Sequence, residues 1–397
     1  MTTAANPSRP PLLISGGRVL VDGAFRLASV LIDGERIARL LPPDHEPIAD
    51  AERIDVNGAA VAPGLIDTHV HGALGRNLME ATPDAIAAVG AHLASGGVTS
   101  FVAGTASVEL DRMLDALGAL SGLARSAPAD GHPQLLGTHL EGPFLSPARA
   151  GVHRREHLLE PTPENIARVI EAADGSLRVA TLAPELPGGL TAVRALVEAG
   201  VVVSAGHTDA DFATTRAAID AGVRRATHLF NAMPPVHHRA PGPIAALLAD
   251  SRVFPELVAD GLHLAPDLLT ALFSSRELAA RLLLVSDGTD VTGLADGPHR
   301  RWEGTEVTLV EGLARTADGG IAGSTRGLLD GVRTLVAADV PLEQALHAAS
   351  SAPAASLGIG DRGRIAAGAV ADLIVLDDEL ELVTTIIRGR PVAPAHH

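Results

Sequence analysis

The middle of the chain alternates short apolar runs with longer amphipathic stretches that are rich in alanine and leucine. Each apolar run has the length of a buried strand and ends in small or polar residues. Helical patterns follow, as in PDAIAAVGAHLASGG at 83–97 and TTRAAIDAG at 214–222. Eight such runs lie around 61–69, 98–104, 134–141, 178–184, 201–207, 224–230, 256–261 and 282–287. Eight β–α units predict an α/β protein with a (β/α)8 barrel of the TIM type rather than an open doubly wound sheet.

The two ends of the chain have a different pattern, with short alternating strands and glycine turns. The N-terminal part contains LLISGGRVL at 12–20 and SVLIDGERIARLL at 29–41. The C-terminal part returns to this style in GRIAAGAVADLIVLD at 363–377. We therefore predict a small β-sandwich-like domain that is assembled from residues 1–60 and 362–397, around a barrel formed by residues 61–361.

Composition excludes several kinds of chemistry. The chain has no cysteine and no lysine, so disulfides, thiolate zinc ligands, Schiff bases and a carboxylated-lysine metal bridge are ruled out. A formal charge of −16 argues against binding of nucleic acid or of an anionic membrane, although a few local cations can still hold a small anion. The N-terminal MTTAANPSRPPLL has no secretory pattern and no run reaches membrane length, so we expect a cytoplasmic protein.

Ionisable residues follow the predicted strands at the end where a TIM barrel carries its active site. His69 and His71 are spaced i, i+2 after the first run, so their side chains project to the same side. Glu141, His207 and His228 end the third, fifth and sixth runs. Each of these residues alone is explained equally well by a helix cap, a salt bridge or a satisfied core histidine. Together they predict a site of nitrogen and oxygen ligands for Zn²⁺ or Fe²⁺.

Asp287 ends the eighth run in Ser-Asp-Gly, and in isolation it would be an ordinary turn residue. Opposite four candidate ligand positions, it becomes the candidate general acid and base for a water that the metal activates. His263 follows the seventh run, and His237, His238 and Arg239 follow the sixth. These basic groups favour an anionic substrate group, although a solvated loop explains His237 and His238 as well. The irregular segment 144–161 is longer than ordinary βα loops and is typical of a lid or binding loop.

The runs PGLIDTHVHG, HLEGPF, GHTDA, THLFNAM, DGLH and SDG occur in this order. Together they resemble the N-acetylglucosamine-6-phosphate deacetylases of the amidohydrolase superfamily, and the resemblance extends from about residue 12 to 390. It implies hydrolysis of an acetamide on a phosphorylated amino sugar, with one or two divalent ions per chain. It also implies a homodimer, in which Arg239 contacts the phosphate in its own site or in that of the partner subunit.

The resemblance also implies roles for particular residues. Glu141, His207 and His228 correspond to the metal ligands of the family, Asp287 to its catalytic acid and base, and His153 to a histidine that polarises the acetamide carbonyl. His69 and His71 make a second metal plausible, with Glu141 as the bridge. The implied substrate contacts are Val152, Asn231, Ala232, Arg239 and His263, together with Ile321, Ala322, Gly323 and Ser324 of a loop near the end of the barrel.

Two other interpretations stay open at this point. A different hydrolase of the superfamily, acting on N-acetylgalactosamine 6-phosphate, an N-acyl amino acid or a cyclic amide, would keep the same metal ligands. A barrel that binds or assembles without catalysis would normally have lost them. The sequence leaves the metal, the number of ions and the sugar epimer undetermined.

Overall fold

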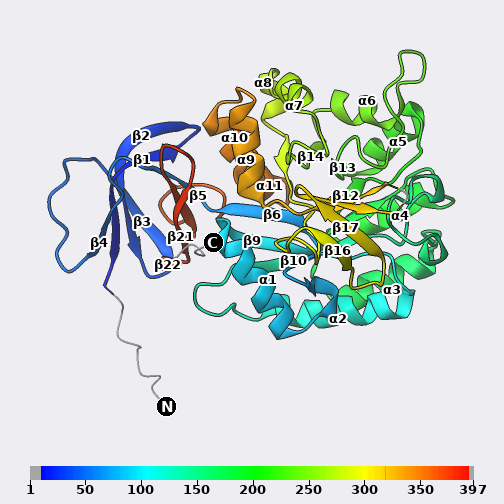
Figure 1. The fold of residues 1–397 in the computed structure, drawn as a ribbon, viewed down its shortest axis with the longest axis horizontal. Helices are drawn as coiled ribbons and strands as arrows, with labels where there is room; N and C mark the ends of the chain where they lie inside the picture. The colour runs from blue at the N-terminus through cyan, green and yellow to red at the C-terminus, as the bar shows by residue number, and fades with distance from the viewer. Residues whose placement is uncertain (1–9, 318, 393–397) are drawn as a thin grey trace.

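A computed structural model describes residues 10–317 and 319–392. Its centre is a parallel barrel whose eight strands follow one another in chain order around the sheet, which confirms the predicted fold class (Figure 1). The strands are β6 Leu65–Val70, β9 Val98–Gly104, β10 Gln134–Glu141, β11 Leu177–Leu182, β12 Val202–Ala205, β13 Val223–Ala226, β14 Phe254–Leu257 and β15 Leu283–Leu284.

The barrel closes between its first strand and the residues just after its last one. Val70 forms an isolated parallel bridge with Gly288. The His71 N–H donates to the Gly288 carbonyl at 2.7 Å, and the Asp287 N–H donates to the His69 carbonyl at 3.0 Å. Closure therefore brings the ends of the first and eighth predicted runs into direct contact.

Helices surround the barrel, and several begin where the sequence provides a capping side chain (Figure 1). Thr82, Thr162 and Asp211 each accept a backbone N–H of the first helical turn, which stabilises the helix start. The helices are α1 Pro83–Ser95, α2 Leu110–Arg125, α3 Pro163–Ala173, α4 Gly189–Glu198, α5 Phe212–Ala221, α6 Gly242–Ala249, α7 Pro266–Phe273, α8 Arg276–Ala279, α9 Leu328–Ala337, α10 Leu342–Ala349 and α11 Ser351–Ser356. None of the helices in the described ranges combines the length and apolar character needed to cross a membrane.

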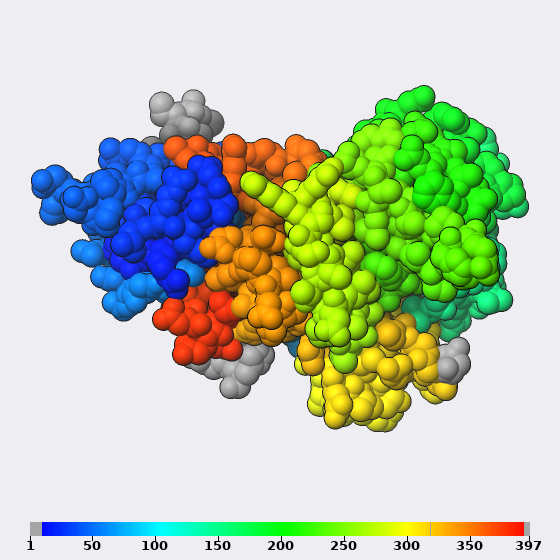
Figure 2. Space-filling model, turned by 90° about the horizontal axis from the view of Figure 1, so that it is seen from above, coloured from blue at the N-terminus to red at the C-terminus, as the bar shows by residue number. Residues whose placement is uncertain are grey.

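Both ends of the chain contribute to one further sheet, in the order β22-β21-β20-β5-β1-β2-β3, with β4 paired to β1. Figure 2 shows the first and last segments of the chain side by side at one end of the molecule. Val30, Val61 and Val375 belong to a hydrophobic core of this sheet. The strands are β1 Leu12–Val21, β2 Ala24–Asp33, β3 Arg36–Leu41, β4 Glu52–Asp55, β5 Ala60–Pro63, β20 Leu373–Leu376, β21 Leu382–Ile387 and β22 Arg390–Val392.

The predicted domain division at 60/61 and 361/362 stays a prediction. Its outermost residues, 1–9 and 393–397, lie outside the described ranges.

An antiparallel sheet that the sequence analysis did not foresee is inserted between β15 and α9. It consists of β16 Gly297–Arg300, β17 Glu306–Val310, β18 Leu313–Thr316 and β19 Ile321–Ser324. The expectation of a loop at 321–324 is therefore wrong, because these residues pair with β18. Along β17 the buried Val307 and Leu309 alternate with exposed residues, which is the pattern of a strand that covers a small core of its own. We call residues 297–324 the inserted sheet.

Shorter elements lie around the mouth of the barrel. The small hairpin of β7 Gly72–Ala73 and β8 Arg76–Asn77 leads into the 3-10 turn η1 Leu78–Glu80. The predicted lid or binding loop at 144–161 contains two further turns, η2 Pro147–Arg149 and η3 Arg155–His157. Phe144 and Leu145 are buried at the start of that segment, so it is anchored in the core before it reaches the mouth.

Candidate metal centre and active site

Several of the predicted site residues lie just beyond the strand ends, in an unusual backbone conformation. His207 and His228 each follow the last residue of their strand by two positions, and Asp287 follows β15 by three. All three have positive φ angles of 47°, 26° and 49°, which a side chain with a Cβ rarely adopts. This conformation ends the ladder earlier than the hydrophobic runs predicted and turns each side chain toward the barrel axis.

The first ligand group has Glu141, His207 and His228 around a common centre. Glu141 Oε1 lies 3.1 Å from His228 Nε2 and 3.4 Å from His207 Nε2. The two Nε2 atoms are 3.0 Å apart, and all three side chains are buried. These atoms satisfy the spacing of a metal site.

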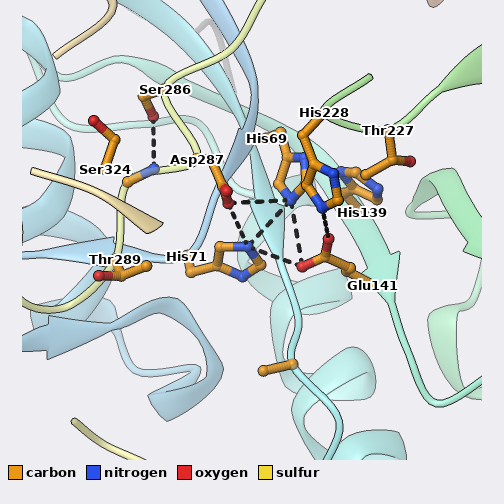
Figure 3. A network of polar contacts seen from close by, with 12 residues as sticks. His69, His71, His139, Glu141, Thr227, His228, Ser286, Asp287, Thr289 and Ser324 are labelled. Carbon is orange, nitrogen blue, oxygen red and sulfur yellow. Dashed lines mark hydrogen bonds and ion pairs between the residues drawn. The ribbon is translucent and has the colours of Figure 1, made fainter. Parts of the chain in front are cut away.

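The second group uses the other oxygen of the same carboxylate (Figure 3). Glu141 Oε2 lies 3.4 Å from His69 Nε2 and 3.2 Å from His71 Nε2. The two histidine nitrogens are 3.1 Å apart. Glu141 thus joins two ligand groups, which is the bridging position that the resemblance implied.

Hydrogen bonds on the far side of two rings show that their inner nitrogens can coordinate a metal. His69 Nδ1 faces the Glu256 carboxylate at 3.0 Å, and His207 Nδ1 faces the Arg149 carbonyl at 2.8 Å. Both partners only accept hydrogen bonds, so Nδ1 carries the proton in each neutral ring and Nε2 keeps its lone pair. The residues present therefore fit a divalent ion.

The electrostatics of the cluster also favour a cation. Burial would lower the pKa of His69, but the charge of Glu141 raises it well above the usual value. Burial would raise the pKa of Glu141, yet the charge of His69 and hydrogen bonds from the other histidines hold it well below its usual value. The pocket stabilises positive charge at its centre, whether a proton or a metal ion carries it.

His153 differs from the ligand histidines in the position of its proton. Its Nδ1 accepts the Ser107 backbone N–H at 3.1 Å, so the proton of the neutral ring is on Nε2. That Nε2 lies 3.5 Å from Glu141 Oε2, and the ring contacts His207 edge to face. His153 therefore presents a hydrogen-bond donor to the centre of the site instead of a lone pair.

Asp287 faces the second ligand group from the opposite side of the barrel (Figure 3). Its Oδ1 lies 3.4 Å from His71 Nε2 and 3.6 Å from His69 Nε2. Burial would raise its pKa, but the hydrogen bond with His71 and the charge of His69 lower the pKa below that of an ordinary aspartate. Its backbone is held by the His69 carbonyl and by the Ser324 N–H, so the carboxylate is fixed in place.

Sequence analysis missed the buried ion pair that supports His69. Arg225 and Glu256 are fully buried, and Arg225 Nη2 lies 2.6 Å from Glu256 Oε1. Burial would raise the pKa of Glu256, but the charge of Arg225 lowers it to about 2, so the carboxylate stays ionised next to His69. Charged residues of opposite sign inside two consecutive strand-length runs were the signal that could have revealed this pair.

Replacement of Glu256 by glutamine is expected to weaken metal binding at the His69 and His71 group by about 10–100-fold, because the partner that fixes the His69 ring loses its charge. The group of Glu141, His207 and His228 should keep its affinity. Metal titration of the metal-free protein, followed by calorimetry, checks this result. Because the variant leaves the buried Arg225 unpaired, the double variant Arg225→Met with Glu256→Gln serves as the control for stability. Unchanged affinity at both groups would contradict the role of Glu256.

The two ligand groups lie at the bottom of a cavity of about 860 Å³. The cavity collects most of the predicted substrate residues, and its far wall is the inserted sheet. Predicted site residues that line it are His71, Glu141, Val152, His153, His207, His228, Asn231, Ala232, His263, Asp287, Ile321 and Gly323. His69 lies beneath this lining, within the buried cluster.

Three predicted contacts are not part of the cavity lining. Ala322 is buried in the core of the inserted sheet, and the Ser324 hydroxyl accepts the Arg326 N–H. Arg239 is exposed, and its guanidinium contacts His238 at 2.7 Å. His237 and His238 lie in the same exposed loop, as the alternative interpretation of that segment expected.

A closed parallel barrel with a buried histidine and carboxylate cluster at the strand ends defines a hydrolase of the metal-dependent barrel class. The sequence profile of the amidohydrolase family matches residues 60–392. The chain belongs to this family, in the group of the N-acetylglucosamine-6-phosphate deacetylases.

The individual relatives cover nearly the whole chain. N-acetylglucosamine-6-phosphate deacetylase of Vibrio furnissii is 35% identical over 347 residues, which are 87% of this chain and 86% of the relative. N-acetylgalactosamine-6-phosphate deacetylase of Escherichia coli O157:H7 is also 35% identical, over 87% of this chain and 90% of the relative. A mutant of the Mycobacterium smegmatis deacetylase, solved in complex with N-acetyl-D-glucosamine-6-phosphate, superposes with a TM-score of 0.89 at 37% identity. That comparison covers 97% of this chain and 100% of the other.

Proposed function

We propose that this chain hydrolyses the acetamide of N-acetylglucosamine 6-phosphate to glucosamine 6-phosphate and acetate. The observation that carries the proposal is the bridging position of Glu141 between two ligand groups, opposite Asp287, at the bottom of a cavity large enough for a sugar phosphate. The enzyme would act in the catabolism or recycling of amino sugars, in the cytoplasm and as a homodimer.

The residues present would hold one or two Zn²⁺ or Fe²⁺ ions per chain. Glu141, His207 and His228 form the first group, and His69 and His71 complete the second. When bound, a divalent ion there supplies a Lewis acid that acidifies water and polarises a carbonyl oxygen.

Asp287 performs the proton transfers. Its carboxylate is ionised and fixed at the edge of the ligand cluster, so it can accept a proton from the attacking water. After the tetrahedral intermediate has formed, the same proton is available for the amine nitrogen that leaves. One rigid carboxylate can thus serve as base and then as acid, because the two proton positions are separated only by the width of the reacting carbon.

His153 stabilises the negative charge that develops on the acetamide oxygen. The Ser107 N–H fixes the proton on His153 Nε2, which faces the ligand cluster as a donor. Donors positioned before the reaction stabilise an oxyanion without reorganisation of the site.

Replacement of His153 by phenylalanine is expected to lower kcat by about 10²–10³-fold, the usual cost of removing one oxyanion donor. The aromatic ring keeps the edge-to-face contact with His207, so bound metal should stay at the wild-type level. Steady-state kinetics and elemental analysis on the same preparation check both parts. A fall in metal content that matches the loss of activity would instead make His153 a ligand.

The phosphate would bind at the side of the cavity where the chain leaves β13. φ is positive at His228, Phe230 and Ala232 but not at the residues between them. This alternation is the backbone pattern that lets consecutive N–H groups converge on an anion. His263 lines the same cavity and donates from Nδ1 to Asp260 at 2.7 Å, which keeps its Nε2 directed elsewhere. Arg239 would reach the phosphate in the site of a second copy of the chain.

Acetate release from N-acetylglucosamine 6-phosphate and from unphosphorylated N-acetylglucosamine, on one metal-loaded preparation, tests the proposal. Rapid turnover of the phosphate ester alone supports both the reaction and the phosphate contacts. Equal rates on both would remove that role from Arg239 and His263, and no release from either would overturn the proposed function.

N-acetylgalactosamine 6-phosphate is a second candidate substrate, because a relative of equal identity is named for it. The same acetate assay with the galactosamine epimer ranks the two substrates. Faster turnover of the galactosamine epimer would assign the chain to that substrate. An N-acyl amino acid, the remaining alternative, carries no phosphate and would gain nothing from the anion contacts after β13.

A further inference from the structure

Polar atoms without partners remain in the cavity after the proposed reaction has been assigned. Among the described residues, the buried cavity-lining side-chain oxygens without a hydrogen-bond partner are Ser107 Oγ, Thr289 Oγ1 and Glu303 Oε2. Glu303 is the one carboxylate of these three. A buried carboxylate oxygen without a partner is costly in free energy, and a ligand that donates to it recovers that cost.

Glu303 is held rigidly by the turn that carries it. Its other oxygen, Oε1, lies 3.3 Å from Arg301 Nε, and the Arg301 and Glu303 side chains are only 5% and 11% exposed. Arg301 Nε also lies 3.1 Å from Asp290, which accepts the Trp302 N–H at 2.6 Å. The Glu303 carboxylate therefore cannot swing away from the cavity without breaking this network.

The free oxygen belongs to the side of the cavity that His153 occupies. Ser107 and Glu303 line one small hollow together with Arg154, and all three also line the main cavity. The Ser107 backbone N–H is bonded to His153 Nδ1. A group that reaches Glu303 Oε2 thus enters beside the donor that faces the acetamide.

We propose that Glu303 is a specificity-determining residue that accepts a hydrogen bond from a sugar hydroxyl on a carbon next to the acetamide-bearing carbon, C1 or C3. The Ser107 hydroxyl, which can donate and accept, completes the contact. This inference rests on the proposed function. A carboxylate suits a neutral hydroxyl because it only accepts, and a site built around such a bond rejects analogues that lack the hydroxyl.

The test compares wild type with Glu303→Gln on N-acetylglucosamine 6-phosphate and on its 1-deoxy and 3-deoxy analogues. Wild type should prefer the parent over one of these analogues by about 10–100-fold in kcat/KM, as expected for one hydrogen bond to a charged group. In Glu303→Gln that preference should fall to within about threefold, because Arg301 retains the amide oxygen and leaves the NH₂ group toward the hydroxyl. The loss should fall on the parent substrate, while the deoxy analogue keeps its wild-type rate.

Two further variants separate recognition from structure. Ser107→Ala should reduce the preference for the same hydroxyl by a smaller factor without disturbing the Arg301 network. Glu306→Gln replaces an exposed cavity-lining glutamate of the same inserted sheet and should leave all ratios unchanged. Thermal unfolding and metal content are measured for each variant, since a structural role would change these and not the ratio of substrates.

The outcomes for Glu303 and for the proposed function are distinguishable. A wild type that discriminates against neither deoxy analogue, or a Glu303→Gln variant that retains the full wild-type preference, overturns the assignment of Glu303 while the enzyme stays active on the parent. If wild-type protein releases acetate from none of the sugar phosphates, the proposed function fails and this inference falls with it.

Discussion

Asp287→Asn is expected to lower kcat by about 10³–10⁴-fold, since the amide can neither accept the proton of the attacking water nor return it to the leaving amine. Asparagine has nearly the shape of aspartate, and the backbone hydrogen bonds of residue 287 to His69 and Ser324 do not involve the side chain. The ligand groups around Glu141 do not include Asp287. Substrate affinity and the content of bound metal should therefore stay near the wild-type level. Single-turnover kinetics, substrate titration and elemental analysis measure the three quantities separately.

The control for this variant is Asp296→Asn, which changes an exposed carboxylate on the same stretch of chain. It should leave kcat unchanged. Turnover of Asp287→Asn within about tenfold of wild type would remove Asp287 from the proton transfers. A parallel loss of metal and activity would make Asp287 a ligand in place of an acid and base.

Glu141→Gln is expected to have the second large effect, on metal binding itself. Its two oxygens face different ligand groups, one with His207 and His228 and the other with His69 and His71. An amide offers one neutral oxygen in place of a shared negative charge. Affinity should fall at both groups by more than about 100-fold, beyond the cost of losing a supporting partner, and hydrolysis should fall below detection.

Metal titration of the metal-free Glu141→Gln protein checks this expectation, with thermal unfolding as the measure of an intact fold. Glu256→Gln is the matched comparison, because that carboxylate touches His69 alone among the ligands. If Glu141→Gln weakens one group and spares the other, Glu141 is a ligand of a single ion. If it binds metal as wild type does, the centre lies elsewhere in the cavity.

The hydrophobic pattern determined most of the fold. Strand-length apolar runs predicted all eight barrel strands, because in a barrel covered by helices both faces of a strand are buried. The pattern placed several strand ends too far along the chain, as at 224–230, where β13 ends at Ala226. Apolar residues continue through Leu229 and Phe230, but the positive φ at His228 stops the pairing. Hydropathy contains no information about that backbone angle.

The inserted sheet was missed for a related reason. Its strands are four or five residues long and pair only with one another, so each has a short alternating pattern that also fits a polar loop. This sheet nevertheless provides a wall of the cavity, including Glu303 and Ile321. The part of the molecule that shapes the substrate site is thus the part that the sequence revealed least.

The sequence by itself determined which residue types meet at the barrel mouth, because the carboxyl ends of parallel strands converge there whatever the details of packing. Only the tertiary structure decided what each histidine does. The proton of His69 is placed by Glu256, 187 positions away, and that of His207 by the Arg149 carbonyl, 58 positions away. The proton of His153 is placed by the Ser107 N–H, 46 positions away. A histidine is a ligand or a donor according to the partner of its other ring nitrogen, and that partner is chosen by packing between distant segments.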